Sequence, residues 1–215
     1  MRLTALWRYP VKSMAGESLA RASLRPDGIE GDRLVHVEDA RGRVVTARRR
    51  PKLLGHRASL ETGELLVDAR PWQSEAVARD VEQAAGPGAR LVSYDGPERF
   101  DVLPLLVATD GAIEAFGHDA RRLRPNLVIG GVEGLAERGW EGRRLRIGRC
   151  LIQIVDLRAR CVMTTFDPDT LEQDPSVLKR VVSSFAGSVA LDCWVEAPGR
   201  IAVGDRVEVV SRLGE

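Results

Sequence analysis

The segment from residue 158 to residue 170, RARCVMTTFDPDT, contains the side chains best suited to chemistry in this chain. Cys161 lies close to Arg158 and Arg160. Neighbouring cations favour the thiolate, which is the form of cysteine that attacks electrophiles and binds metals. Two interpretations follow from these residues alone. Cys161 is a reactive thiol or a metal ligand, or it is one of the many free cysteines that only pack in a core.

The acidic residues that follow this cysteine also allow two interpretations. Asp167 and Asp169 flank Pro168 and precede Thr170. Two neighbouring carboxylates can act as an acid–base pair in catalysis. The same sequence is typical of a turn in which Asp side chains accept hydrogen bonds from nearby backbone amides. The residue types favour the turn.

Short strands and a few helices must position these side chains. The apolar segment 150–157, which ends just before the cysteine, is the clearest strand in the chain. Further strands are expected at 3–11, 19–24, 33–38, 43–46, 57–61, 64–67, 89–94, 103–108, 126–129, 189–196 and 206–210. Helices are expected at 74–84, 111–116 and 175–185. This order shows no βαβ rhythm and no repeat, and it predicts a mainly β or α+β fold built around a closed β-barrel.

The composition excludes several classes of protein. A chain of 215 residues fits one large domain or two small, tightly packed ones. Its 44% hydrophobic and 29% charged residues are ordinary for a globular protein. The net charge of +1 gives no general attraction to nucleic acid. No segment approaches the length of a membrane span, and no signal peptide is visible. We therefore expect neither a nucleic acid nor a membrane as a partner.

The cysteines indicate a reducing compartment. Three widely spaced cysteines do not form a disulfide framework. The absence of a CxxC pair argues against an iron–sulfur cluster or structural zinc. This pattern predicts a cytoplasmic protein. Cys150 and Cys193 lie within strand patterns beside Leu151 and Trp194, and we expect both to be core residues.

Several short motifs occur in a fixed order along the chain. They are Tyr9-Pro10-Val11-Lys12-Ser13 with Gly16, Gly31-Asp32-Arg33, Thr46-Ala47-Arg48 with Pro51 and Leu53, Arg124-Pro125-Asn126-Leu127-Val128-Ile129, Arg160-Cys161 with Thr164-Thr165 and the Asp-Pro-Asp-Thr segment, and Val203-Gly204-Asp205. Together they resemble the MOSC family, named for the C-terminal domain of molybdenum cofactor sulfurases. The relatives that this pattern most resembles are MOSC proteins of the amidoxime-reducing type.

The resemblance implies a fold and a cofactor. It implies a β-barrel MOSC domain, here residues 96–215, packed with an N-terminal β-rich subdomain, here residues 1–95. It also implies a molybdenum–molybdopterin cofactor. The chain shows no pyridoxal-phosphate or iron–sulfur motif of its own.

The resemblance further implies a set of cofactor-binding residues. Lys12 and Ser13 would hold the cofactor phosphate, although Lys12 taken alone is an ordinary exposed lysine. Guanidinium groups match phosphate geometry, so Arg33 and Arg48 would extend a cationic wall. The remaining expected cofactor-binding residues are Thr46, Arg124, Asn126, Arg160 and Thr165. Asn126 has two equally supported roles, because its amide can read the edge of a heterocycle or bond to the backbone at a strand start.

The catalytic residues are expected to be Cys161 and Asp167. A soft thiolate suits a metal that is already held by the sulfur atoms of its cofactor, so Cys161 is the expected ligand to molybdenum. In the family the loop that holds Asp167 lies beside the metal, and Asp167 would there position a substrate or a proton. Leu171 replaces the glycine that relatives usually have, which leaves the range of substrates open.

Two functions fit these expectations. In the first, the protein is a molybdenum-dependent oxidoreductase that reduces N-hydroxylated small molecules. Its electrons would come from a separate flavin, haem or iron–sulfur protein, because the chain has none of those motifs. In the second, the protein is a persulfide carrier on Cys161, or it binds and delivers the molybdenum cofactor without redox turnover. The two hypotheses differ in the metal content that they predict for the purified protein.

Overall fold

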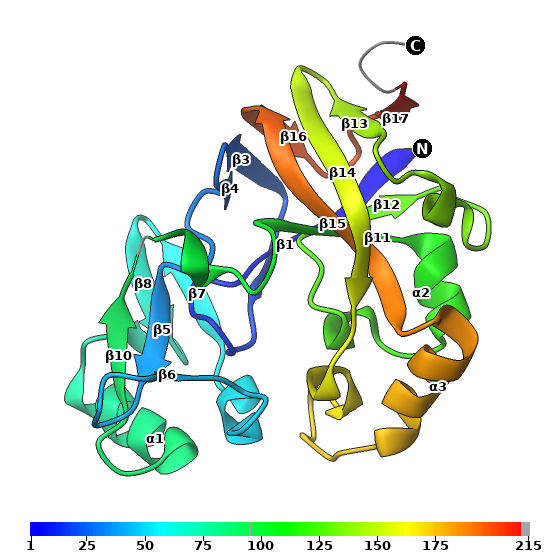
Figure 1. Cartoon of the computed structure of the whole chain (residues 1–215). Coiled ribbons are helices and arrows are strands. Elements are labelled where there is room, and N and C mark those ends of the chain that lie inside the picture. Colours follow the sequence, from blue (N-terminus) through cyan, green and yellow to red (C-terminus); the bar gives the residue numbers. More distant parts are fainter. Residues whose placement is uncertain (95, 212–215) are drawn as a thin grey trace.

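The computed structural model of the chain describes residues 1–94 and 96–211. These residues are mostly β-structure with three α-helices, as the sequence predicts (Figure 1). The strands are β1 (Arg2–Arg8), β2 (Glu17–Leu19), β3 (Arg21–Arg25), β4 (Gly28–Ile29), β5 (Val35–Glu38), β6 (Val44–Val45), β7 (Ala58–Glu61), β8 (Glu64–Val67), β9 (Arg70–Pro71), β10 (Arg90–Ser93), β11 (Leu105–Thr109), β12 (Leu127–Gly130), β13 (Arg144–Ile147), β14 (Cys150–Ala159), β15 (Ser188–Ala197), β16 (Gly199–Ala202) and β17 (Val207–Val210). The helices are α1 (Glu75–Ala85), α2 (Asp110–Phe116) and α3 (Pro175–Phe185), with short 3-10 helices η1 (Pro51–Gly55), η2 (Pro97–Arg99), η3 (Ala120–Arg122), η4 (Ala136–Gly139) and η5 (Val162–Thr165).

One large sheet organises the body that contains β14 and β15. It has eight strands in the order β17-β13-β14-β15-β11-β12-β1-β2, so the start of the chain pairs with its second half. The segment that leads into β17, at one end of this sheet, bonds to the start of β1, near the other end. The amide of Leu3 donates to the carbonyl of Asp205 at 2.9 Å, and the amide of Val207 donates to that of Met1 at 3.0 Å. The small sheet β16-β3-β4 extends this body.

The large sheet contains a βαβ crossover among the described residues, although the order of the elements shows no repeated βαβ rhythm. Strands β11 and β12 are parallel, with Val107 opposite Leu127, and α2 lies between them in sequence. Thr109 caps α2 by accepting a hydrogen bond from the amide of Ala112 at 3.1 Å. The helix has only seven residues. The sequence predicts the helix and both strands but not their parallel pairing, which is a long-range property.

A second, smaller body carries the sheets β10-β5-β6 and β7-β8-β9 together with α1, on the left of Figure 1. The apolar stripe predicted for α1 is buried, with Val77 and Val81 fully inaccessible. The hydroxyl oxygen of Ser74 accepts a hydrogen bond from the amide of Val77 at 3.4 Å and caps the helix. Met163, in η5 of the second half of the chain, also packs against this core.

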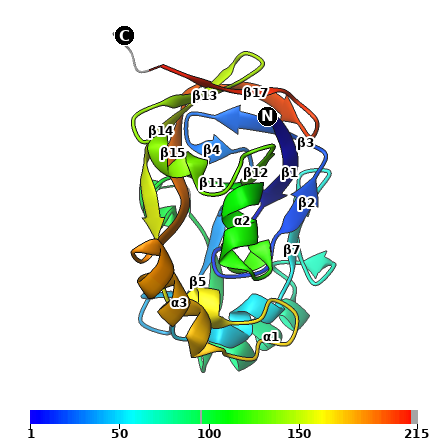
Figure 2. The same ribbon diagram turned by 90° about the vertical axis from the view of Figure 1, so that its right-hand side faces the viewer.

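The other two helices belong to the large-sheet body. Figure 2 shows α2 in front of the sheet and α3 at the end of the molecule away from β13 and β17. The two helices share an apolar cluster that includes Phe116, Val181 and Phe185. Helix α3 begins at Pro175 after an Asp174 cap, at the residue that the sequence predicts. None of the helices in residues 1–94 and 96–211 combines the length and the apolarity that a membrane crossing requires.

The first fourteen residues connect the two bodies. Leu3 and Leu6 lie in the core of the large sheet, whereas Val11 and Met14 lie in the core of the small sheets. The Tyr-Pro-Val-Lys-Ser motif is therefore placed where the chain passes from one core to the other. The division into residues 1–95 and 96–215 stays a prediction, and residue 95 itself lies outside the described residues.

Candidate functional site

A cavity of about 130 Å3 lies between the two bodies, at the end of β14. We call it the cationic pocket. Its walls carry the positive side chains of Lys12, Arg33, Arg48, Arg122, Arg124, Arg158 and Arg160, together with Asp101, Cys161, Ser13, Thr46, Asn126 and Met163. Every site residue predicted from the sequence is in this set except Thr165 and Asp167. Segments that are far apart in the chain thus converge on one strongly positive cavity.

Lys12 and Arg48 meet at a shared carboxylate. Asp101 accepts from the Lys12 Nζ atom at 2.9 Å through one oxygen and from Arg48 at 2.9 Å through the other. Burial raises the pKa of Asp101, but Lys12, Arg48 and Arg33 outweigh that effect and lower it below the usual value. The same Asp101 carboxylate raises the pKa of Arg48, and the Cys161 side chain adds to that effect. Asp101 thus pairs with Lys12 and with Arg48 in the pocket that contains the cysteine.

Replacing Asp101 with asparagine should lower stability at neutral pH but have little effect in acid. A carboxyl with a depressed folded-state pKa contributes stability above its unfolded pKa, which is 3.8 for the model compound, and loses it as the pH falls through the folded value. The difference in unfolding free energy between wild type and variant should therefore shrink below about pH 4. Urea unfolding at a series of pH values would measure it. Glu114→Gln, on an exposed face of α2, is the control, and a difference independent of pH would contradict the prediction.

Three residues of the pocket adopt left-handed backbone conformations. Ser13 has a φ of 73°, Arg33 of 54° and Arg124 of 56°. Each such residue other than glycine costs on the order of 1 kcal/mol and persists only where its surroundings hold it. The Ser13 hydroxyl is fixed here, because it accepts a hydrogen bond from the amide of Ala47 at 3.0 Å. Strained backbone concentrates at functional sites, and its occurrence at three positions of one cavity marks the pocket as such a site.

A buried polar cluster beneath the pocket holds these residues in place. The Asp32 carboxylate accepts from the amide of Tyr9 at 2.6 Å, from the side-chain amide of Asn126 at 3.3 Å and from the Arg33 guanidinium. The Tyr9 hydroxyl donates to the carbonyl of Pro125 at 3.1 Å, and burial raises its pKa to about 12. The guanidinium groups of Arg33 and Arg124 both lie over the ring of Tyr9, at 5.3 Å and 4.3 Å from its centre.

Asn126 is engaged mainly with the protein itself. Its side-chain oxygen accepts from the amide of Leu106 at 3.1 Å, and its side-chain nitrogen donates to Trp7 and Asp32. The amide thus joins β1 to β11 at the start of β12. Of the two roles expected for Asn126, the geometry favours bonding to the backbone. Its role in reading the edge of a heterocycle stays a prediction.

Two half-buried arginines of the pocket, Arg124 and Arg160, have no carboxylate paired with them among the described residues. Burial lowers the pKa of Arg124 to about 10 and that of Arg160 to about 10. Arg160 donates one hydrogen bond to the carbonyl of Leu123 at 2.7 Å, while its Nε atom is buried without a partner. Arg124 stacks on Tyr9 at 4.3 Å and has no ion pair with any residue in the described ranges. Desolvated cations of this kind are costly unless an anion compensates them, and these charges make the pocket suited to an anion.

Cys161 lies where the long β14–β15 ladder ends. The amide of Arg160 makes the last backbone bond, to Gly187, and Cys161 then caps η5 in an extended conformation. Its side chain is partly exposed and lines the pocket. Cys150 and Cys193 are fully buried, as predicted, and burial raises the pKa of both thiols. Cys161 is therefore the thiol that a cofactor in this pocket can reach.

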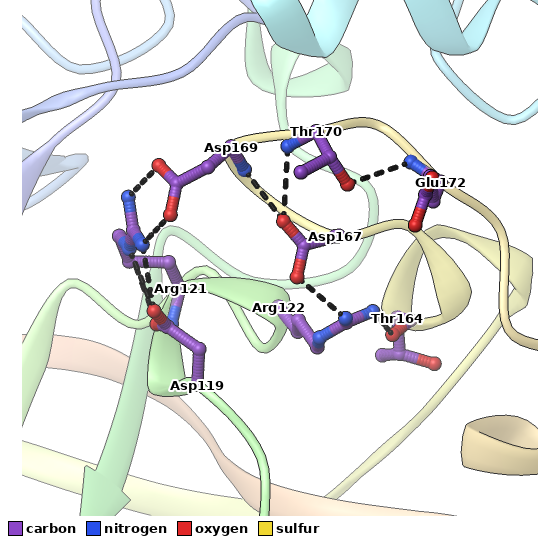
Figure 3. Close-up of polar contacts among 8 residues, drawn as sticks. All are labelled: Asp119, Arg121, Arg122, Thr164, Asp167, Asp169, Thr170 and Glu172. Atoms are coloured by element: carbon purple, nitrogen blue, oxygen red, sulfur yellow. Dashed lines mark hydrogen bonds and ion pairs between the residues drawn. The ribbon is translucent and has the colours of Figure 1, made fainter.

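Asp167 and Thr165 lie outside the cationic pocket. Figure 3 shows that one oxygen of Asp167 accepts from the amides of Asp169 and Thr170, both at 3.0 Å, and the other pairs with Arg122 at 2.9 Å. The backbone bond from Thr170 is the largest of the effects that lower the pKa of Asp167. The Thr165 hydroxyl donates to the carbonyl of Val162 at 2.6 Å. This geometry is that of the turn, and the catalytic role of Asp167 stays a prediction.

Several residues of the pocket were not predicted as site residues, and Asp101, Arg122, Arg158 and Met163 are the polar, charged or thioether side chains among them. Asp101 lies in a loop that looks like a plain connection, and only its contacts with Lys12 and Arg48 give it a place in the site. Arg122 belongs to a basic run that resembles a solvated surface, yet its side chain is only 9% exposed. Met163 and Arg158 flank Cys161 in sequence, so the signal for them was their proximity to the cysteine.

Comparison with known proteins identifies the family. Residues 1–96 match the MOSC N-terminal beta barrel domain, and residues 108–208 match the MOSC domain. Mitochondrial amidoxime-reducing component 1 of Homo sapiens and that of Mus musculus are each 27% identical to this chain over 96% of its length and 82% of theirs. The YuaD protein from Bacillus subtilis, a solved structure, has the same fold, with a TM-score of 0.54 at 15% identity over 97% of this chain and 94% of that one. Because both domain models match in order and cover nearly all of the sequence, this chain belongs to the MOSC-domain family.

Proposed function

We propose that this protein binds the molybdenum–molybdopterin cofactor in the cationic pocket and uses it to reduce N-hydroxylated small molecules. The observation that carries the proposal is the pairing, in one cavity, of under-compensated half-buried arginines with the accessible thiol of Cys161. The first feature suits a phosphate and the second suits a soft metal. MOSC-family membership and the names of the amidoxime-reducing relatives support the same function.

The pocket residues divide into three roles in this proposal. Lys12, Ser13 and Arg48 would hold the phosphate, with Arg160 offering its free Nε–H donor to an acceptor atom of the cofactor. Arg33 and Arg124 would add positive charge over the ring of Tyr9. Cys161 would bind the metal. Within residues 1–94 and 96–211 no three His, Cys, Asp or Glu side chains come together, so the cofactor would supply most ligands of the metal.

The redox chemistry would come from the cofactor, which supplies a metal that exchanges two electrons with a bound substrate. The protein's part is to orient the reacting groups, to exclude water and to place the guanidinium of Arg48 beside the side chain of Cys161. The electrons would come from a separate donor protein of the flavin, haem or iron–sulfur type. A cytoplasmic location stays a prediction from the cysteine pattern, and the relatives named above are mitochondrial.

Metal analysis of protein purified from a host that makes the pterin cofactor would test this proposal. We expect about one molybdenum per chain and reduction of an amidoxime when an artificial electron donor is present. Well-folded protein with no molybdenum and no reductase activity would contradict the proposal. In that case the mass of the intact chain would show whether Cys161 carries a persulfide, as a sulfur carrier requires.

Replacing Lys12 with alanine should weaken retention of the cofactor. The variant loses a charge-assisted hydrogen bond to phosphate, worth about 1.5–3 kcal/mol, which corresponds to roughly 10- to 100-fold in affinity. Molybdenum content after extensive dialysis would measure the loss. Lys179→Ala, which removes an exposed lysine of α3, is the matched control. Equal retention by both variants would show that Lys12 does not bind the phosphate.

A further inference from the structure

A second cavity, of about 380 Å3, adjoins the cationic pocket. We call it the adjoining pocket. Its lining residues are Trp7, Tyr9, Ala15, Gly16, Leu54, Gly55, Arg57, Arg121, Arg122, Arg124, Met163, Phe166, Pro168 and Asp169. The two cavities share Arg122, Arg124 and Met163, so a molecule in one would lie against the same side chains as a molecule in the other. No cofactor-binding role predicted from the sequence falls on a residue that lines the adjoining pocket alone.

The walls of this pocket suit a flat, apolar group. Trp7, Leu54, Met163 and Phe166 supply aromatic, aliphatic and thioether surface. Gly16 is required for this shape, because a Cβ atom there would lie 2.5 Å from the ring of Tyr9. The wall is thus a set of large apolar side chains packed around close backbone, a surface that takes aromatic ligands.

The charges of the pocket are unequally compensated. Figure 3 shows Arg121 paired with Asp169 at 2.6 Å and with Asp119 at 2.7 Å, and Arg122 paired with Asp167 at 2.9 Å. These contacts compensate the charges of Arg121 and Arg122, and they engage Asp169, the carboxylate that lines the adjoining pocket.

Two other arginines of the adjoining pocket have no carboxylate as a counter-ion among the described residues. Arg57 and Arg124 form no ion pair with another residue of the described chain. Arg124 faces both cavities, whereas Arg57 lines only the adjoining one. The adjoining pocket thus has a positive charge of its own, at Arg57, that does not serve the cationic pocket.

From this arrangement we infer that the adjoining pocket is the substrate site and that it selects N-hydroxylated aromatic compounds that carry a carboxylate. The inference rests on the proposed function, because it takes the reacting end of the substrate to lie on the shared side, by Met163 and Arg124. The aromatic body occupies the apolar wall between Trp7 and Phe166. The carboxylate lies toward Arg57, whose guanidinium is the group that separates charged from neutral substrates.

A pair of probes that differ only in charge tests the inference. Benzamidoxime is neutral, and its 4-carboxylate derivative presents the same reacting group with an anion at the far end of the ring. Calorimetry gives the dissociation constant of each probe for the purified protein, and steady-state turnover gives kcat/KM for protein that carries molybdenum. We expect the carboxylate to bind more tightly and to show the higher kcat/KM.

Arg57→Gln should weaken binding of the carboxylate about three- to fivefold, the range for a partly exposed ion pair, and leave benzamidoxime unchanged. Arg57→Glu should reverse the preference. Arg146→Gln, which removes an exposed arginine of β13 that lines neither pocket, is the control and should change nothing.

The outcomes separate the inference from the proposed function. Equal binding of the two probes, or a preference that survives both Arg57 variants, would overturn the inference even if the protein contains molybdenum and reduces both compounds. Loss of carboxylate binding once the cofactor is loaded would also overturn it, because the adjoining pocket would then belong to the cofactor. Protein without molybdenum or any turnover would refute the proposed function, and the substrate role of the pocket with it.

Discussion

Replacing Cys161 with alanine is expected to leave the protein folded and to abolish both molybdenum retention and reduction of N-hydroxylated compounds. The Cys161 side chain is partly exposed at the end of β14, so truncation creates no sealed cavity in either core. Cys161 contacts η5 through its backbone carbonyl instead. That carbonyl accepts hydrogen bonds from the amide of Thr164 at 3.0 Å and from the hydroxyl of Thr164 at 2.9 Å. Alanine preserves both.

Metal content, reductase activity and thermal unfolding of this variant should be measured together. Cys193→Ala is the matched control, because it removes a thiol buried in the large-sheet core and distant in role from the pocket. We expect the control to lower stability and keep its molybdenum, the reverse of the result for Cys161→Ala. Wild-type turnover by Cys161→Ala would show that the cysteine does not bind the metal.

The sequence predicts most elements of the fold because their signals are local. All three expected helices are present, and α3 has the bounds that the sequence predicts. The long strand before the cysteine is confirmed as β14, extended by two residues. The crossover between β11 and β12 was missed, because pairing of parallel strands is a long-range property that no short window contains.

The candidate site was predictable as a set of residues but not as a geometry. Motifs led to Lys12, Arg33, Arg124 and Cys161, and the structure brings all four to one cavity. Residue types cannot reveal which side chains are already engaged. Asn126 looks like a group free to read a ligand, and its amide is bound within the protein.

Neither the backbone strain nor the missing counter-ions of the pocket could be predicted from the sequence. The left-handed conformations of Ser13, Arg33 and Arg124 arise from contacts between segments distant in the chain. The same is true of the unpartnered Nε atom of Arg160. Both features cost stability in the cofactor-free chain, and an anion in the pocket would offset the second. We therefore expect the protein to be more stable when its pocket is filled, as for any ligand that binds only the folded state.

Because the strained backbone of the pocket costs stability, the buried polar cluster beneath it must hold that backbone in place. Asp32 makes the most contacts in this cluster. Its side chain is fully buried, and it joins the amide of Tyr9, the side chain of Asn126 and the guanidinium of Arg33. These partners come from three separate motifs. Asp32 thus connects Tyr9, where the chain passes from one body to the other, to Asn126 at the start of β12. Within the described residues, no other carboxylate takes part in these contacts.

Replacing Asp32 with alanine should therefore destabilise the protein by about 3–5 kcal/mol, the cost of leaving one partner of a buried ion pair behind. That is a large share of the roughly 5–15 kcal/mol that holds a typical domain together. Asp32→Asn keeps acceptor atoms for Tyr9 and should cost less, while still leaving Arg33 without its counter-ion. Urea unfolding would measure both variants, with Asp156→Ala on the exposed part of β14 as control. If both Asp32 variants unfold at the wild-type urea concentration, Tyr9 and Arg33 are positioned by packing alone, and the cluster beneath the pocket is not what maintains the strained conformations above it.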